Sequence, residues 1–228
     1  SRGLGDVYKR QKNNIIFATS KGNVRRNKIT DFQNINANGK IAMKLVNDDK
    51  LVNVITCEEN SSIFLSSRLG KCIRFIAKDI RLFSGRTSIG VRGIKLQKDD
   101  SVISLAILRD FKFEVDERDI YLKASNQLRK DEKLDDTMLS DQKFSLMKEN
   151  EEFILSITDK GYGKRSSAYE FRVTKRGGLG IANMQLTKRN GSEVIASFPI
   201  KDNDHLMLVT DKGKLIRCPV DDLSLIHI

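Results

Sequence analysis

The stretch ILSITDKGYGKR, Ile154 to Arg165, decides the fold, because LMLVTDKGKLIR, Leu206 to Arg217, repeats its order of apolar run, glycine and cation. Alignment on the glycines gives four copies of this unit, centred on Gly22, Gly70, Gly161 and Gly213. Four residues after each glycine stands an arginine: Arg26, Arg74, Arg165 and Arg217. Self-similarity of this kind predicts an array of like structural units.

The match continues along each unit. An acid follows nine residues after each glycine (Asp31, Asp79, Glu170, Asp222), and an apolar residue follows after ten (Phe32, Ile80, Phe171, Leu223). The first three units share a second glycine with a leucine six residues later, at Gly39, Gly90 and Gly180. A β-branched run then follows in each: LVNVITC, VISLAIL and VIASFPI. Each unit therefore predicts about four short strands, which is typical of a propeller-like blade in an all-β fold.

We expect residues 12–222 to form one repeat domain. The glycine spacings are 48, 91 and 52, and the long middle value places an insertion at residues 110–152. This segment holds 8 Lys/Arg against 13 Asp/Glu and contains no glycine, so we expect a charged, partly helical excursion from a blade. Residues 1–11 and 223–228 break the pattern and are predicted to be non-native ends.

The formal charge of +11 favours a polyanionic partner. Because the insertion carries 8 − 13 = −5, the rest of the chain carries +16. No apolar run approaches the roughly 20 residues that a membrane helix needs, and no secretory pattern is visible, so we expect no membrane partner and a cytoplasmic location.

The chemistry-bearing residues predict no catalytic or metal site in this chain. Cys57, Cys72 and Cys218 lack the spacing of a zinc site and are expected to be reduced, and neither His205 nor His227 lies in a metal-like cluster. GYGKRS at 161–166 lacks the first glycine of a phosphate loop, and GLGIAN at 178–183 lacks the third glycine of a dinucleotide fingerprint.

The repeated arginine has two interpretations. It can pair with the acid five residues later, or it can belong to a basic band that recurs once per blade and binds the phosphates of duplex DNA. We favour the band, because cations outnumber acids in each unit, and expect Ala at Arg74 and Arg165 to weaken DNA binding with the fold intact. Aromatic residues are too few to favour single strands. The predicted DNA-binding residues are Arg25, Arg26, Lys28, Lys71, Arg74, Lys78, Lys164, Arg165, Lys175, Arg176, Lys214 and Arg217. The alternative is a protein-interaction propeller that does not wrap DNA.

Two stretches, TDKGYGKRSSAYEFRVTKRGGLGIANMQLTKRNG and GKIAMKLVNDDKLVNV, resemble the C-terminal repeats of the bacterial DNA gyrase A subunit, with those of topoisomerase IV as second choice. The resemblance implies a β-pinwheel, a disc of blades whose neighbours exchange strands, here incomplete because the chain holds fewer units than the family's disc. TKRGGLG, Thr174 to Gly180, is the nearest match to the gyrase hallmark heptad, and implies phosphate contact through Lys175, Arg176 and exposed backbone.

The resemblance also implies a function. The disc wraps duplex DNA and so supports ATP-dependent negative supercoiling by a type IIA topoisomerase in the bacterial nucleoid. The implied partners are double-stranded DNA, the rest of the gyrase A subunit and the gyrase B subunit, which is a separate chain. ATP and Mg²⁺ belong to the holoenzyme, and no cofactor is expected in this chain.

Overall fold

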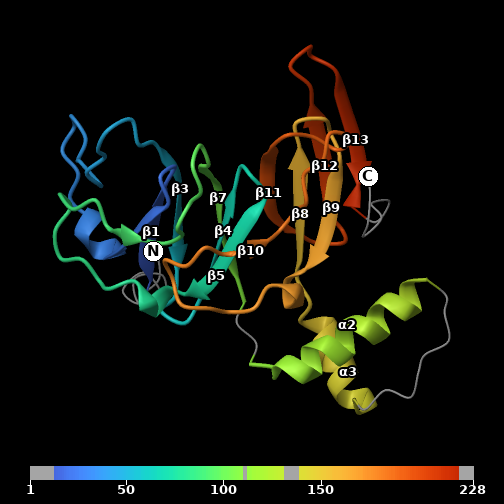
Figure 1. Ribbon diagram of the computed structural model, residues 1–228. Helices are drawn as coiled ribbons and strands as arrows, with labels where there is room; N and C mark the ends of the chain where they lie inside the picture. Colours follow the sequence, from blue (N-terminus) through green and yellow to red (C-terminus); the bar gives the residue numbers. More distant parts are fainter. Residues whose placement is uncertain (1–12, 110–111, 131–138, 221–228) are drawn as a thin grey trace, which may run out of the picture.

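A computed structural model describes residues 13–109, 112–130 and 139–220 of the chain. It is a row of antiparallel sheets, here called blades 1 to 4, with a helical hairpin beside blade 3 (Figure 1). The predicted ends, with Asp222 and Leu223, lie outside the described residues.

Blade 1 has the strand order β3-β1-β2-β6. Strand β1 (Asn14–Thr19) turns through Gly22 into β2 (Asn23–Lys28), and β3 (Leu51–Cys57) pairs with the other side of β1. The fourth strand, β6 (Val91–Arg92), comes from the next repeat unit and pairs with β2. The strand exchange implied by the resemblance is therefore present.

Blade 2 repeats this arrangement in the order β10-β5-β4-β7. Strands β4 (Ser62–Ser67), β5 (Lys71–Ile76) and β7 (Val102–Leu108) come from the second unit, and β10 (Ile181–Ala182) comes from the third. In both blades the exchanged strand is an edge strand. At the opposite edge, β7 packs against both β3 and β11, so this edge faces the inside of the row.

Blade 3 contains β8 (Phe153–Thr158), β9 (Gly163–Ser167) and β11 (Val194–Ile200), in the order β11-β8-β9. Blade 4 is the hairpin of β12 (His205–Val209) and β13 (Leu215–Pro219). The first and last sheets share no strand among the described residues, in agreement with the expected incomplete disc.

The apolar runs of the repeats form cores between neighbouring blades. One buried cluster joins blades 1 and 2 through residues such as Ile16, Val24, Ile63 and Phe75. Similar clusters join blade 2 to blade 3 and blade 3 to blade 4. Because each apolar face is buried against the next unit, the blades depend on their neighbours for stability.

The turn glycines also hold the next unit. The carbonyl of Gly70 accepts hydrogen bonds from the backbone N–H groups of Asn183 (2.8 Å) and Met184 (3.2 Å). Gly70 has φ +79°, and a Cβ at this position would lie 2.2 Å from the Met184 carbonyl oxygen. Glycine is therefore needed here for both the turn and the close approach of the next unit.

The insertion forms α2 (Val115–Arg129) and α3 (Asp141–Glu149). Its buried residues Tyr121, Leu139 and Met147 pack on Tyr169, which lies in the short helix η3 (Ala168–Glu170) directly after β9. The corresponding short helices after β2 and β5 are η1 (Ile29–Phe32) and η2 (Ala77–Asp79).

Candidate nucleic-acid interface

The repeated arginine joins consecutive blades in the first two units. Arg26 is 5% exposed, and its Nε donates to the carbonyl oxygen of Ile80 at 2.8 Å. Arg74 is 6% exposed, and its Nη1 donates to the carbonyl oxygens of Ala168 (2.9 Å) and Phe171 (3.4 Å). Ile80 and Phe171 both stand ten residues after the glycine of the following unit. The equivalent arginines of two successive units therefore make equivalent contacts between blades.

Arg26 and Arg165 do not pair with the carboxylates five residues later, Asp31 and Glu170. Arg26 pairs with Glu59 at 3.4 Å, and Arg165 pairs with Asp202 and lies 3.9 Å above the ring of Phe153. Arg26 and Arg74 thus have a structural role, but they perform it mainly through backbone carbonyls of the neighbouring unit and not through the acid pairing that the first interpretation expected.

Arg25 is also interior. Its Nη1 donates to the carbonyl oxygens of Ala42, Arg86 and Ser88 at 3.3, 2.5 and 3.1 Å. Burial lowers the pKa of Arg25 from its ordinary value, against the opposing effect of Asp31. We therefore revise the prediction for Arg25, Arg26 and Arg74, because guanidinium groups enclosed by the fold are not available to phosphates.

The remaining predicted cations lie nearer the surface. Lys28, Lys78, Lys175, Lys214 and Arg217 are exposed. The half-buried members are Lys71, Lys164, Arg165 and Arg176. Of these, Lys164 already pairs with Glu170 at 3.6 Å. The exposed group and the seams described next are what the fold offers to a polyanion.

The first seam is formed where the second unit crosses the outer edge of blade 1, and we define it by Lys44, Arg86 and Ile89. The backbone N–H of Lys44 donates to the carbonyl of Ser88 at 3.4 Å. Arg86 Nη1 donates to the carbonyl of Ile41 at 3.3 Å. These bonds place a lysine of one unit beside an arginine of the next.

The second seam, which we define by Lys95, Lys175, Arg176 and Leu179, repeats these contacts between blades 2 and 3. The backbone N–H of Lys95 donates to the carbonyl of Gly178 at 2.8 Å, and Arg176 Nη1 donates to the carbonyl of Arg92 at 3.0 Å. Lys44 and Lys95 each stand five residues after a second glycine, and each arginine stands four residues before one. Equivalent residues of successive units thus build both seams.

The seams contain cations without acidic partners. Among the ion pairs of the described residues, none involves Lys44, Lys95, Lys175 or Arg176. Lys44, Lys95 and Lys175 are exposed, and Arg92 on strand β6 is exposed beside them. The outer edge of the blades therefore carries cations that form no ion pair among the described residues.

Sequence reasoning found Lys175 and Arg176 but missed Lys44, Arg86, Arg92 and Lys95. The signal was present, because the lysines recur in GKIAMKL and GVRGIKL around the second glycine. The TKRGGLG segment lies in the second seam, where the Gly177 N–H donates to the carbonyl of Gly93 at 2.5 Å. That amide is used by the fold, and the half-buried Arg176 guanidinium donates to the carbonyls of Asp79 at 2.8 Å and Arg92 at 3.0 Å, so the exposed Lys175 is the most accessible cation of this segment.

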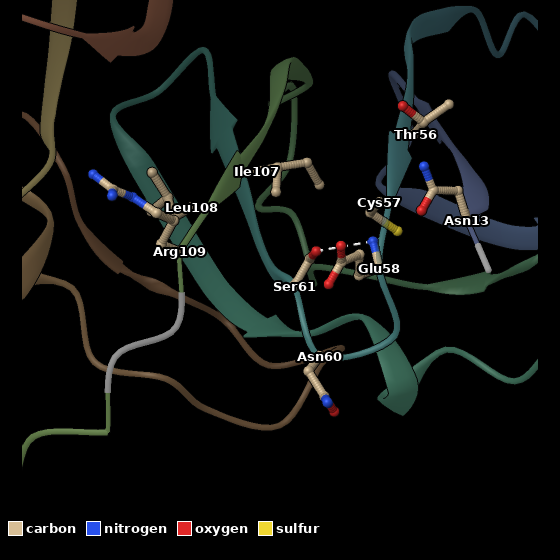
Figure 2. A pocket seen from close by; sticks show the side chains of 9 residues that line it. All are labelled: Asn13, Thr56, Cys57, Glu58, Asn60, Ser61, Ile107, Leu108 and Arg109. Carbon is tan, nitrogen blue, oxygen red and sulfur yellow. Dashed lines mark hydrogen bonds between the residues drawn. The ribbon is translucent and has the colours of Figure 1, made fainter. Parts of the chain in front are cut away.

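A cavity of about 490 Å³ lies at the ends of β3 and β7, but it holds no catalytic arrangement (Figure 2). Its Ser61 hydroxyl accepts a hydrogen bond from the Glu58 N–H at 3.0 Å, and its Arg109 pairs with Glu152 at 3.2 Å. Cys57 also lines the cavity, and burial raises the pKa of its thiol to about 11. The thiol is therefore protonated near neutral pH.

The structure also bears on the rejected loops. Gly161 of GYGKRS joins strands β8 and β9, so the loop does not lead into the helix that a phosphate loop requires. Within residues 13–109, 112–130 and 139–220, no group of three or more His, Cys, Asp or Glu is placed to hold a metal ion. No helix in these ranges is long and apolar enough to cross a membrane.

Strand-exchanging blades in an open row define a β-propeller-like repeat domain of the pinwheel type. The family model described as "DNA gyrase C-terminal domain, beta-propeller" matches residues 13–58, 61–109, 152–201 and 204–227. The chain belongs to the DNA gyrase C-terminal domain family. The resemblance seen in the sequence is therefore confirmed.

Curated relatives agree with this assignment. The DNA gyrase A subunit of Granulibacter bethesdensis is 45% identical over 232 residues, covering 92% of this chain and 25% of the relative. The DNA gyrase A subunit of Rickettsia bellii is 44% identical over 220 residues, covering 93% of this chain and 24% of the relative. The chain thus spans about a quarter of the length of these relatives.

Solved structures show the same fold. The C-terminal domain of DNA topoisomerase IV has a TM-score of 0.71 at 19% identity, covering 93% of this chain and 54% of that one. The DNA gyrase A C-terminal domain has a TM-score of 0.64 at 20% identity, covering 91% and 55%. The predicted all-β pinwheel is therefore confirmed.

Proposed function

We propose that this domain binds duplex DNA without sequence preference and wraps it along the outer edge of its blades. The observation that carries the proposal is the repetition of one cationic arrangement, Lys44 with Arg86 and Lys95 with Arg176, at two successive seams. Cations at regular intervals suit a rod of regularly spaced phosphates, and each neutralised phosphate releases condensed counterions.

The wrapping part of the proposal follows from the row of blades. A duplex that follows one seam to the next must bend, and a smooth bend of 40–90° over 20–30 base pairs costs on the order of 1–6 kcal/mol. Several lysine and arginine contacts can exceed this cost at low salt. The exposed cations Lys28, Lys78, Lys214 and Arg217 extend the basic surface beyond the seams.

Family membership supports the wider role. We propose that the domain serves the A subunit of a DNA gyrase, which is a type IIA topoisomerase. Its partners would be the remainder of that polypeptide together with the gyrase B subunit. Strand cleavage, Mg²⁺ and ATP would belong to those other parts, and wrapping would support negative supercoiling at the bacterial nucleoid.

The test is the salt dependence of duplex binding by the wild type and a triple variant, Lys44→Ala, Lys95→Ala and Lys175→Ala. The matched control removes three exposed lysines of the insertion, Lys112, Lys130 and Lys148, and so has the same net charge. If each seam lysine binds one phosphate, the slope of log affinity against log salt becomes shallower by about 2.7, since each contact contributes about 0.9.

We expect the seam variant to lose affinity equally for unrelated duplexes, and the control to keep nearly the wild-type slope. Equal slopes for the two variants would refute the seams as the binding surface. A wild type that binds duplex weakly with a flat slope would instead support the protein-interaction alternative.

A further inference from the structure

Each seam carries an exposed aliphatic side chain among its cations. Ile89 is 40% exposed and Leu179 is 60% exposed. Both stand immediately before the second glycine of their units, at Gly90 and Gly180. A single exposed leucine on a protein surface is ordinary, but equivalent ones in the same cationic setting on successive blades indicate a shared use.

The backbone beside these side chains is fixed by close approach. A Cβ on Gly90 would lie 2.3 Å from the Val24 carbonyl oxygen, and a Cβ on Gly180 would lie 2.3 Å from that of Cys72. Both glycines have positive φ, at +85° and +71°. The chain is thus pressed against the outer strand of the previous blade, and the neighbouring aliphatic residue starts from a rigid position. Binding there loses little conformational entropy.

The cations around Ile89 and Leu179 indicate which kind of partner these side chains contact. Ser88, which adjoins Ile89, accepts from the Lys44 backbone, and Gly178, which adjoins Leu179, accepts from the Lys95 backbone. Leu179 also lines a cavity of about 220 Å³ together with the exposed cations Arg172 and Lys175. An apolar side chain flanked by unpaired cations complements a groove between two phosphate rows better than it complements an apolar protein surface.

The minor groove fits this arrangement. It is about 6 Å wide, whereas the major groove is about 12 Å wide and about 8.5 Å deep and is normally filled by a helix or a β-ribbon. A single aliphatic side chain fills much more of the narrow minor groove than of the wide major groove, so it contacts both walls only in the minor groove. Bending toward the protein also narrows the groove that faces it, which favours inserted arginine.

We propose that Ile89 and Leu179 are DNA-contact residues that pack against the deoxyribose edges of the inward-facing minor groove, between phosphates held by the seam cations. This inference rests on the proposed function. It adds a salt-independent component to binding and sets the rotational position of the duplex on the blades.

The test replaces both residues with asparagine, the residue that the first unit already has at the equivalent position, Asn38. The matched control is Val115→Asn with Leu146→Asn, which changes two similarly exposed apolar side chains of the insertion helices. Hydroxyl-radical footprinting reports directly on protection of the deoxyriboses, and a salt titration reports separately on the phosphate contacts. Unfolding midpoints check that each variant folds, with Ala as the replacement where Asn does not.

We expect the Ile89 and Leu179 variant to lose the periodic sugar protection and to bind about tenfold more weakly at every salt concentration, with an unchanged slope. The control keeps both properties. Unchanged protection would overturn the inference, and so would a loss of affinity that comes with a shallower slope, because the residues would then act only by positioning the cations. A flat wild-type slope would refute the proposed function itself.

Discussion

Two glycines with the same backbone φ angle allow the energetic contribution of the contact between blades to be measured separately from the cost of the turn conformation. Gly70 and Gly161 both have φ +79°, and each donates its N–H to the residue three positions earlier, Ser67 at 3.1 Å and Thr158 at 2.9 Å. They differ in what lies beyond the turn. A Cβ on Gly70 would lie 2.2 Å from the Met184 carbonyl oxygen, whereas a Cβ on Gly161 would meet nothing within 4 Å.

The expected cost of Gly161→Ala is the conformational cost alone. An L-residue in the left-handed region costs about 1–2 kcal/mol. Gly70→Ala carries the same cost and a second one, because the added methyl must displace a backbone segment. Overpacking costs about 1–3 kcal/mol. The displacement also weakens the bonds that the Gly70 carbonyl accepts from Asn183 and Met184, each worth about 1 kcal/mol. The two variants should therefore differ in the free energy of unfolding by about 3 kcal/mol.

Urea denaturation of the wild type and both variants measures this difference. The comparison is valid where the slopes of the transitions agree, because a changed slope indicates a changed unfolding unit. Destabilisation of both variants by the same amount, within about 0.5 kcal/mol, would refute the close contact between blades 2 and 3 and the dependence of each blade on its neighbour for stability.

Two further predictions compare a buried side chain with a more exposed one of the same type, first among the repeated arginines and then among the cysteines. Arg74→Ala should lower the free energy of unfolding by about 3 kcal/mol or more, because it removes a buried side chain that donates to the carbonyls of Ala168, Phe171 and Arg109. The exposed Arg217→Ala should change it by less than about 0.5 kcal/mol. Thermal unfolding of the two variants measures both effects, and equal effects would contradict the structural role of Arg74. Burial raises the pKa of Cys57 to about 11 and that of Cys72 to about 12, from an ordinary value of 9.0. Iodoacetamide at pH 8 should therefore modify the half-buried Cys218 well before these two thiols, and the free energy of unfolding should fall as pH rises above 9, where only the unfolded chain releases these protons. Rapid modification of all three thiols in the folded protein would contradict this prediction.

The repeat made the blade architecture predictable from the sequence. Period, glycine turns and β-branched runs are local signals, and each unit contains all of them. The exchange of β6 and β10 was available only through the resemblance, because a two-residue strand has no periodicity of its own. The helices of the insertion follow from its composition, whereas their docking through Tyr121 and Met147 onto Tyr169 depends on contacts that no local pattern contains.

The candidate site was harder to predict, and the arginines show why. Counting cations against acids suggested that the repeated arginine was free to bind DNA. Its partners in the first two units are backbone carbonyls, such as that of Ile80 for Arg26, which a count of charged residues does not register. Whether a repeated cation is buried depends on the unit that follows it, and this is a tertiary property. The seam lysines Lys44 and Lys95 were missed for a related reason, because the role of the second glycine in docking the next unit is not visible in the sequence.

The same dependence on the next unit couples stability to DNA binding. Each seam takes one lysine, Lys44 or Lys95, from one unit and its arginine from the following one, so a seam exists only where two consecutive units are docked. Arg74 lies under that docking between blades 2 and 3, since its guanidinium donates to the Ala168 carbonyl at 2.9 Å. An Arg74→Ala variant can therefore lose affinity for DNA even though the Arg74 side chain makes no contact with DNA. The two causes separate in a salt titration. Loss through undocking removes folded molecules and leaves the slope of the remainder unchanged, whereas loss of a direct phosphate contact reduces the slope by about 0.9.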